Sequence, residues 1–329
     1  MARKGTAASN GKAISKASIL VRDQYDKRND VTLFTGRCEE FLPQIGGGEI
    51  QLVVTSPPYN VGKRYESKRT IDEYVEEQRT VIELCAGRLA TTGSICWQVG
   101  NHVANNEVYP IDVMLYPVFR RLGLVLRNRV VWHFEHGLHC NRRLSGRYET
   151  IMWFTWPGQE YTFHLDPIRV PQKYPGKKHF KGPRAGQYSA NPAGKNPGDV
   201  WVIPNVKHNH VEKTRHPCQF PVELVERLVL ALSDPKDLVV DPYIGAGTTA
   251  IAAILHGRRA AGADIEREYI SISRERMRNV VAGTLRTRPM NRPVYKPSGS
   301  ITIPPWEPDG ERPTAVARTM LEPSRRALE

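Results

Sequence analysis

The sequence predicts an α/β protein with a mainly parallel sheet and helices on both faces. Apolar runs of strand length alternate with stretches of helical spacing from about residue 31 to residue 155, and this alternation is typical of parallel sheets. The run Ile50-Gln-Leu-Val-Val54 has the composition of a buried strand. The 329 residues, of which 40% are hydrophobic, are enough for a sizeable core in one large domain or two.

The elements follow from this alternation in chain order. Strands are predicted at 31–35, 50–54, 93–99, 126–133, 148–154, 238–241 and 259–264. Helices are predicted at 38–42, 72–89, 111–122 and 222–233, with a further helix that begins at Thr248.

One candidate site is Val54-Thr-Ser-Pro-Pro-Tyr-Asn60, directly after a buried strand. Its two prolines remove ladder donors, so the strand must end abruptly. The Ser56 hydroxyl, the carbonyls of Ser56 and Pro57, and the Tyr59 ring can then face one cavity. Acceptors beside a stacking ring suit a planar group with an amino substituent, such as a nucleobase. An ordinary strand-to-loop turn would account for the two prolines alone.

A second site lies far downstream, in Asp241-Pro-Tyr-Ile-Gly-Ala-Gly-Thr-Thr249. Gly245 and Gly247 let the backbone approach a ligand closely, and the helix that begins at Thr248 presents free N–H groups. The next strand ends in Asp264, and nucleotide sites hold a ribose diol at that position. The missing third glycine separates this turn from the dinucleotide-binding fingerprint.

The segment 159–215 breaks the alternation, because it is rich in Pro and Gly and carries many cations with interleaved aromatic residues. Basic side chains neutralise phosphates and aromatic rings stack on bases, and a loop of this length is uncommon in a compact domain unless it is functional. A solvated basic loop is the alternative. The predicted nucleic-acid contacts are Lys173, Lys177, Lys178, Lys181 and Arg184, with Arg142 and Arg143 of the loop 134–147 as a second candidate.

Composition bears on partner and compartment. A net charge of +13 favours a polyanionic partner. No apolar run is long enough for a membrane span, and the N-terminus lacks the pattern of a signal peptide. Five scattered cysteines without a Cys-x-x-Cys pair favour a reducing cytoplasm. The basic segment 1–30 and the Pro- and Arg-rich segment 283–329 are predicted to be tails.

Together the two motifs resemble those of DNA methyltransferases that modify exocyclic amino groups. Their order, with the catalytic motif first, is similar to the β class of that family. The resemblance covers about residues 31–280 and includes His216-Pro-Cys-Gln-Phe-Pro221, similar to a His-Pro-x-Gln-x-Pro motif. It implies a circularly permuted, Rossmann-like methyltransferase fold, with the last two strands of the first half as an antiparallel hairpin at one sheet edge. The implied segments are a catalytic half at 31–158, an inserted target-recognition region at 159–215 and a cofactor-binding half at 216–282.

The resemblance also implies the ligands and their residues. The cofactor would be S-adenosylmethionine and the substrate double-stranded DNA, and such enzymes usually protect DNA from a companion restriction endonuclease. The implied catalytic residues are Ser56, Pro57, Pro58 and Tyr59. The implied cofactor-binding residues are Gln219, Asp241, Tyr243, Gly245, Gly247, Thr248 and Asp264. Serine before Pro-Pro favours cytosine-N4 over adenine-N6 as the methylated position.

Several alternatives stay open. Cys218 follows a proline, as the nucleophile of cytosine-C5 methyltransferases does, but it precedes the cofactor motif instead of following it. His208, His210, His216 and Cys218 have no spacing typical of a zinc site, so no metal is predicted. Arg37 stands where many family members carry an acid for the cofactor's adenine. RNA bases, a protein glutamine amide, and DNA binding without catalysis are the alternative functions.

Overall fold

The computed structural model describes residues 19–58, 70–135, 137, 139–158 and 160–294. The chain divides into two units, 1–292 and 293–329, and every helix and strand named below belongs to the first. Tyr59 of the predicted catalytic motif lies outside the described residues. Within those residues, no helix combines the length and the apolar character that crossing a bilayer requires.

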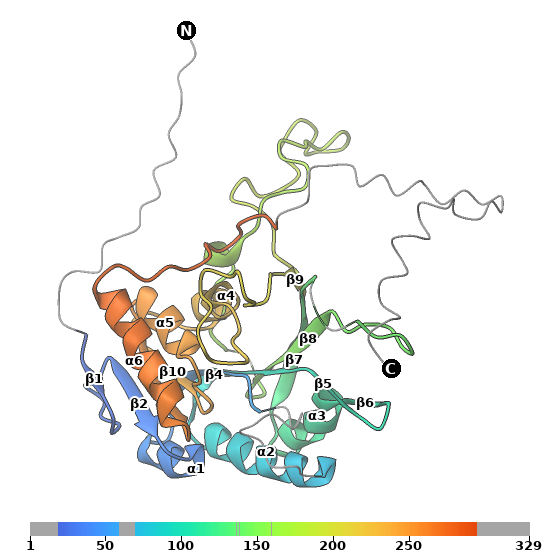
Figure 1. Ribbon diagram of the computed structural model, residues 1–329. Coiled ribbons are helices and arrows are strands. Elements are labelled where there is room, and N and C mark those ends of the chain that lie inside the picture. Colours follow the sequence, from blue (N-terminus) through green and yellow to red (C-terminus); the bar gives the residue numbers. More distant parts are fainter. Residues whose placement is uncertain (1–18, 59–69, 136, 138, 159, 295–329) are drawn as a thin grey trace. The chain divides into compact units, whose positions relative to one another are not determined.

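A nine-stranded sheet runs through the first unit (Figure 1). In spatial order its strands are β1 (Val21–Arg22), β2 (Val31–Thr35), β11 (Arg259–Asp264), β10 (Leu238–Asp241), β3 (Ile50–Thr55), β4 (Leu89–Val99), β8 (Tyr148–Thr155), β7 (Val125–His133) and β9 (Val200–Val202). Neighbours from β1 to β4 are all parallel, whereas β8 is antiparallel to both β4 and β7. The predicted α/β class with a mainly parallel sheet is confirmed, and the circular permutation stays a prediction.

Helices cover both faces of the sheet, and each face has its own core. The helices of one face are α1 (Cys38–Phe41), α2 (Ile71–Ala86) and α3 (Ile111–Arg121), and those of the other are α4 (Val222–Leu232), α5 (Thr248–Leu255) and α6 (Arg267–Val281) (Figure 1). Successive strand residues point to opposite faces. Val53 of β3 therefore joins the core beside α2, while Leu52 and Val54 join the core beside α4 and α5. Because both faces are covered, β3 is buried along its whole length.

The predicted antiparallel hairpin is confirmed as β7 and β8, but it does not form the sheet edge. β9, a short strand from the predicted insertion, pairs with β7 on its outer side. The sequence does not predict a second hairpin, which consists of β5 (Asn101–Ala104) and β6 (Glu107–Pro110). Its turn holds Asn105 and Asn106 at φ of 52° and 64°, a left-handed conformation that asparagine tolerates.

Both predicted tails contribute residues to the first unit. Val21 lies in the predicted tail 1–30, yet it pairs with β2 as part of an edge strand. In the predicted tail 283–329, Arg288 is only 8% exposed, forms an ion pair with Glu223 of α4, and donates its backbone N–H to the Glu212 carboxylate (3.0 Å). The tail boundaries predicted from composition therefore need correction, because composition does not show which residues of a polar segment pair with a strand or a helix.

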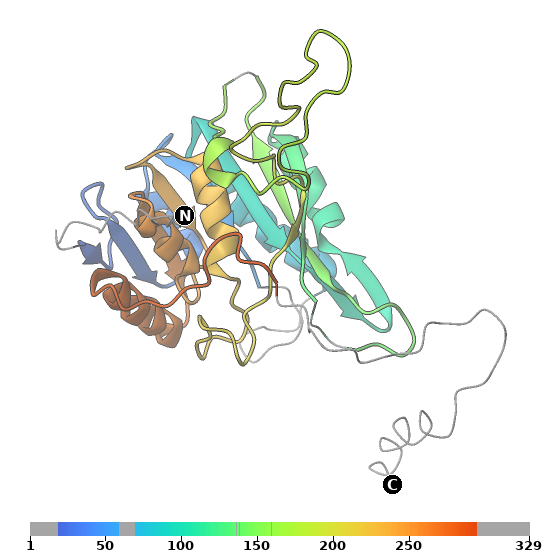
Figure 2. The same cartoon turned by 90° about the horizontal axis from the view of Figure 1, so that it is seen from above.

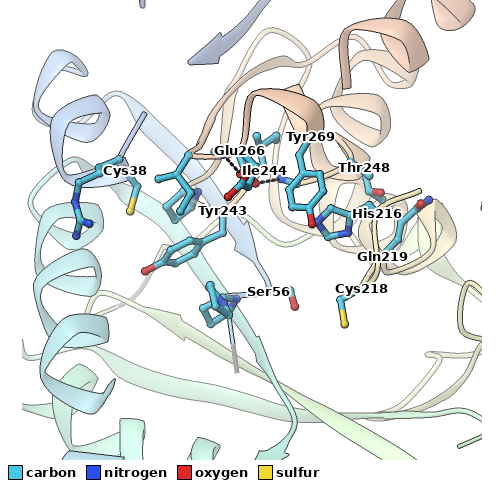
Figure 3. Close-up of a pocket in the computed structure, with 18 of the residues that line it drawn as sticks. Cys38, Ser56, His216, Cys218, Gln219, Tyr243, Ile244, Thr248, Glu266 and Tyr269 are labelled. Atoms are coloured by element: carbon cyan, nitrogen blue, oxygen red, sulfur yellow. Dashed lines mark hydrogen bonds between the residues drawn. The ribbon is translucent and has the colours of Figure 1, made fainter. Parts of the chain in front are cut away.

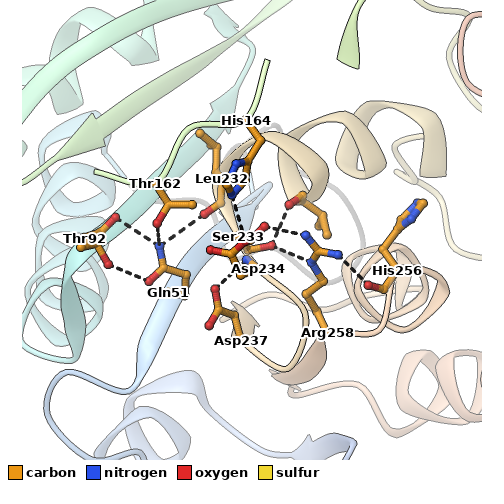
Figure 4. A network of polar contacts seen from close by, with 11 residues as sticks. Gln51, Thr92, Thr162, His164, Leu232, Ser233, Asp234, Asp237, His256 and Arg258 are labelled. Atoms are coloured by element: carbon orange, nitrogen blue, oxygen red, sulfur yellow. Dashed lines mark hydrogen bonds and ion pairs between the residues drawn. The ribbon is translucent and has the colours of Figure 1, made fainter. Parts of the chain in front are cut away.

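The insertion begins at the amino edge of the sheet, where β3 starts. The Gln51 amide nitrogen lies within hydrogen-bond distance of Thr162 Oγ1 (3.0 Å) and of the carbonyls of Thr92 (3.1 Å) and Leu232 (3.4 Å), as Figure 4 shows. In the same region, the His164 N–H donates to the carbonyl of Ala231 (2.7 Å). These bonds fix the first part of the insertion to the edge of the sheet opposite the carboxyl end of β3.

Residues 170–195, which we call the finger, extend beyond this anchor as a long loop. Bridges between Val170 and Lys195 and between Lys178 and Tyr188 hold its two arms together. In Figure 2 the finger projects at the end of the sheet opposite to the loop 134–147.

Candidate active site

A cavity of about 210 Å³ lies at the carboxyl edge of β2, β3, β10 and β11 (Figure 3). The segments that follow these strands form its wall, together with α2 and the loop before α4. The carboxyl edge of a parallel sheet is where α/β proteins bind ligands. The predicted catalytic and cofactor motifs are far apart in the sequence, but they share this cavity because β3 and β10 are neighbours in the sheet.

Two glycines of the turn between β10 and α5 have left-handed conformations. Gly245 (φ +47°) lines the cavity, and a Cβ there would lie 2.9 Å from His216 Nε2. Gly247 (φ +76°) is not one of the lining residues, and its Cβ would lie 2.8 Å from Ser273 Oγ of α6. The predicted close approach to a ligand thus fits Gly245. For Gly247 the missing side chain lets the turn pack against α6, and a close approach to the ligand stays a prediction.

Asp264, at the end of β11, contributes its carboxylate to the cavity wall. Oδ2 accepts the N–H of Gly245 (3.1 Å), and Oδ1 accepts the N–H of Glu266 (2.8 Å). Burial raises the pKa of this carboxyl group to about 6. Each carboxylate oxygen has a second lone pair, so Asp264 can still accept the two hydroxyl groups of a diol.

Asp241, at the end of β10, is 1% exposed and is not one of the lining residues. Its Oδ1 accepts the hydroxyl of Thr55 (2.6 Å) and the N–H of Tyr243 (3.1 Å), and its Oδ2 accepts the hydroxyl of Thr249 (2.7 Å). The carboxylate thereby joins the end of β3 to the beginning of α5. Asp241 thus lies behind the cavity wall, and its predicted role in cofactor binding stays a prediction.

The sequence does not single out two residues of α6 that hold the turn from behind. Ser273 Oγ donates to the carbonyl of Gly245 (2.6 Å), and Arg276 donates to the carbonyl of Ala246 (2.6 Å) and to Thr248 Oγ1 (3.1 Å). Arg276 is 5% exposed, and burial lowers its pKa to about 10. No sequence signal reveals this role, because an arginine on a helix is ordinarily exposed.

The loop before α4 supplies another part of the wall. Gln219 donates from its side chain to the carbonyl of Glu212 (2.9 Å) and accepts the hydroxyl of Thr214 (2.9 Å). The His216 ring meets Tyr269 of α6 edge to face at 4.3 Å (Figure 3). Cys218 is exposed and lines the cavity, near the predicted cofactor site. Across the described part of the chain, no group of three or more His, Cys, Asp or Glu side chains is placed to hold a metal ion.

Ser56, Pro57 and Pro58 line the cavity directly after β3. Ser56 comes directly after Thr55, which donates its hydroxyl to Asp241 (2.6 Å), so the strand end that presents it is fixed to β10. The predicted cofactor residues that line the same cavity are Gln219, Tyr243, Gly245, Thr248 and Asp264.

The segment after β2 adds an acid that the sequence analysis does not single out. Arg37, Cys38 and Glu39 all line the cavity. The Glu39 carboxylate pairs with Arg37 (2.5 Å) and accepts the thiol of Cys38 (3.3 Å). Tyr243 lies in the same wall, where its hydroxyl accepts the side-chain amide of Gln78 (3.2 Å). An acid therefore reaches the cavity two residues beyond the position at which Arg37 departs from the expected pattern.

A family model described as DNA methylase (N6_N4_Mtase) matches residues 50–275. The chain belongs to this family. The type II methyltransferase M.BglII of Bacillus subtilis is 46% identical over 254 residues, which cover 77% of this chain and 70% of the relative. The type II methyltransferase M.ScaI of Streptomyces caespitosus is 32% identical over 280 residues, which cover 82% of this chain and 90% of the relative.

Two solved structures are similar to this DNA methylase in fold. The cytosine-N4-specific PvuII DNA methyltransferase aligns with a TM-score of 0.59 and 19% identity over 82% of this chain and 97% of its own. A Thermus thermophilus protein is described as a DNA modification methylase complexed with S-adenosyl-L-methionine. It aligns with a TM-score of 0.53 and 26% identity over 77% of this chain and 93% of its own. The family match makes the protein a DNA amino-methyltransferase.

The cations predicted to contact DNA fall into two groups in this methylase. Arg142 and Arg143 are exposed on the loop 134–147, which connects β7 and β8 at the carboxyl edge of β3 and β4. The finger carries the other five, Lys173, Lys177, Lys178, Lys181 and Arg184, at the opposite end of the sheet (Figure 2). Of these two groups, the arginine pair shares the edge of the sheet that holds the cavity.

Proposed function

We propose that this protein transfers a methyl group from S-adenosylmethionine to an exocyclic amino group of a base in double-stranded DNA, at a specific short sequence. The observation that carries the proposal is the shared cavity, since Ser56 of the catalytic motif and Asp264 of the cofactor motif both line it. Membership of the DNA methylase family supports the class of reaction.

The residues of the wall fit S-adenosylmethionine at its nucleoside end. Asp264 keeps acceptor lone pairs for ribose hydroxyls, and Gly245 leaves room where a side chain would intrude. The Glu39 carboxylate can accept a hydrogen bond from the adenine amino group. When bound, the cofactor supplies an electrophilic methyl group on a sulfonium sulfur. The complex of the Thermus relative with this molecule supports the choice.

Ser56 and Pro57 line the cavity with the acceptors that an amino group needs. A nucleobase amino nitrogen is a poor nucleophile, because its lone pair is delocalised into the ring. The Ser56 hydroxyl and the Pro57 carbonyl accept its two hydrogens and draw the nitrogen towards tetrahedral geometry, which frees the lone pair. The N–C bond then forms as the S–C bond breaks, and the nitrogen releases a proton to solvent. Holding both reactants in one cavity makes the step effectively unimolecular.

We propose cytosine-N4 as the methylated position, on the basis of serine before Pro-Pro, with adenine-N6 as the alternative. Relatives do not separate the two, because one structural neighbour is named cytosine-N4-specific while an Escherichia coli relative is named a DNA adenine methyltransferase. The stacking role of Tyr59 belongs to the same proposal. RNA methylation and DNA binding without catalysis stay as alternatives.

The cellular setting is also a proposal. Several relatives are named type II methyltransferases, and this supports a companion restriction endonuclease that acts on the same DNA sequence. A cytoplasmic location follows from a DNA substrate and from five cysteines without a disulfide.

Sequencing of methylated bases in DNA from cells that express the protein, with mass spectrometry of the nucleosides, tests the proposal. We expect N4-methylcytosine at one short sequence. N6-methyladenine would change only the assignment of the base, whereas unmodified DNA together with methylated RNA would change the substrate. The finding of 5-methylcytosine, together with an inactive Cys218→Ser variant, would overturn the mechanism.

Ser56→Ala tests the catalytic motif by itself. We expect the methyl-transfer rate to fall roughly 10- to 100-fold, the effect of losing a hydrogen bond worth about 1–3 kcal/mol in the transition state. Cofactor affinity measured by calorimetry should not change. Cys218→Ser is the matched control, because Cys218 lines the same cavity but forms no covalent bond in this mechanism. An equal loss in both variants would contradict the role of Ser56.

A further inference from the structure

We propose that Leu144 enters the DNA duplex as a wedge and occupies the space left when the target base turns out of the stack. A base within a duplex cannot reach an enclosed site unless it leaves the helix. The inference rests on the proposed function, because it assigns a residue to the step that brings the base into the cavity.

Leu144 is 95% exposed, and it stands directly after Arg142 and Arg143, which are exposed too. Single exposed leucines are common on protein surfaces, so what distinguishes Leu144 is its place directly beside two exposed arginines at the edge of the sheet that holds the cavity. Proteins that kink DNA insert apolar side chains such as leucine between base steps. Neighbouring arginines can hold the phosphates on either side of the opened step.

The loop that carries Leu144 is braced in two places. The N–H of Phe134 donates to the carbonyl of Arg147 (2.8 Å) and closes the base of the loop. Nearer the tip, the N–H of Cys140 donates to Ser145 Oγ (3.0 Å). Leu144 is therefore exposed on a closed turn. Its insertion into DNA costs less conformational entropy than the insertion of a residue on an unbraced loop would.

The loop also has the right place and length. It leaves β7 at His133, which pairs with Tyr148 at the carboxyl edge of the sheet. β8 and β4 separate β7 from β3, which is about 15 Å across the sheet at 4.7–4.9 Å per strand. The register places Thr55 level with Arg129, so His133 stands four residues, roughly 13 Å, further along, and the root of the loop lies roughly 20 Å from the strand end that precedes Ser56. Leu144 stands four residues before Tyr148, so it can lie up to roughly 14 Å from the root of the loop. Leu144 can thus contact a duplex beside the cavity, because the target base itself crosses the remaining distance when it turns out of the stack.

Phe180 is the strongest competitor, but its position excludes it. Its side chain is 89% exposed and stands next to Lys181. The finger that carries it projects at the end of the sheet opposite to the loop 134–147 (Figure 2). A side chain at that end cannot fill the gap beside a base whose amino group lies at Ser56.

Methyl-transfer rates on two duplexes test the wedge. Both contain the recognition sequence that the sequencing of methylated bases reveals. In one of them the target base lies opposite an abasic position. We expect Leu144→Ala to methylate the fully paired duplex at least about tenfold more slowly than wild type, and the abasic duplex within about twofold, because the unpaired base leaves the stack easily. Leu144→Met, which keeps a long apolar side chain, should restore most of the rate on the paired duplex.

Val281→Ala is the control, because Val281 is 53% exposed at the end of α6, outside the cavity wall, and should change neither rate. Equal losses of Leu144→Ala on both duplexes, or wild-type rates on both, would overturn the wedge. A Phe180→Ala variant that is slow only on the fully paired duplex would also overturn the proposal, because the wedge would then be Phe180 on the finger. A wild-type protein that methylates neither duplex would refute the proposed function itself.

Discussion

At the scale of single residues, the buried Asp241 and the half-buried Asp264 share a raised pKa but have different tasks. Burial raises the pKa of both Asp241 and Asp264 to about 6. Asp241 accepts hydrogen bonds from three groups of the protein and lies behind the cavity wall. Asp264 accepts two backbone N–H groups and lines the cavity. A bound ligand can therefore contact Asp264 directly, whereas it affects Asp241 only through the turn.

Cofactor affinity is expected to fall as the pH drops through about 6. Ribose hydroxyls donate to the charged form of Asp264, so protonation of the carboxylate competes with binding. Calorimetry on both sides of this pH measures the effect. Asp264→Asn, which is neutral throughout, should bind weakly and without this pH dependence. Equal wild-type affinities above and below the pKa would contradict the ribose contact.

The raised pKa values of Asp241 and Asp264 also lower the stability of the folded protein at neutral pH. The folded carboxyl groups hold a proton more tightly than their ordinary pKa of 3.8 allows. The two groups therefore contribute stability that is fully present below about pH 4 and is lost as the pH rises through about 6. Without cofactor, the free energy of unfolding should show this decline as a separate component, which Asp264→Asn reduces.

Gly247→Ala is expected to lower the free energy of unfolding by about 1–3 kcal/mol. The added Cβ would force a side chain into a left-handed conformation and lie 2.8 Å from Ser273 Oγ of α6. Gly245→Ala is also forced into a left-handed conformation, but its Cβ meets only the end of the His216 side chain, so it should lower the free energy of unfolding less and reduce cofactor affinity as well. Urea unfolding and calorimetry on the two variants separate these effects. Wild-type stability of Gly247→Ala would contradict the packing role.

At the scale of elements, residues 283–292 act as a strap across α4. Arg288 pairs with Glu223, and the N–H of Asn291 donates to the same carboxylate (2.9 Å). Glu212 accepts the N–H groups of Arg288 (3.0 Å) and Val222 (2.9 Å). Since Gln219 bonds the Glu212 carbonyl, the strap is connected to the cavity loop.

Arg288→Ala is expected to lower the free energy of unfolding by about 3–5 kcal/mol, because it leaves a buried carboxylate without its partner. Glu223 is 2% exposed, and burial already raises its pKa even with Arg288 present. A chain that ends at residue 292 should keep wild-type stability, whereas one that ends at residue 282 should lose as much as the point variant. Wild-type stability of the shorter chain would restore the tail boundary predicted at 283.

The two cationic segments can be told apart by the salt dependence of DNA binding. Replacing Arg142 and Arg143 by alanine should reduce the log–log slope by about 2, one for each phosphate contact. Replacing Lys177, Lys178 and Lys181 on the finger should change it by less than about 1, because the finger lies far from the cavity edge. A fall of about 3 in the lysine variant would support the contacts predicted from the sequence.

At the scale of the whole molecule, the cavity connects segments from both ends of the described chain, from Gly36 to Tyr269. A ligand bound there holds several strand ends in the folded arrangement and none in the unfolded chain. S-adenosylmethionine at about 100 times its Kd should therefore stabilise the protein by roughly 2.7 kcal/mol. Thermal unfolding measures this shift, and Asp264→Asn should remove most of it. An unchanged wild-type Tm at saturating cofactor would contradict the site.

The sequence by itself determined the α/β class, most strands and helices, and the core of the site. Ser56, Gly245 and Asp264 were predictable because each depends on a local pattern, a strand followed by a turn of special residues. Tertiary structure alone decided which charged side chains became buried partners, as for Asp241 and Arg276. It also decided which cationic loop shares the edge of the cavity. Both depend on contacts between segments far apart in the sequence, and composition and periodicity describe only neighbours along the chain.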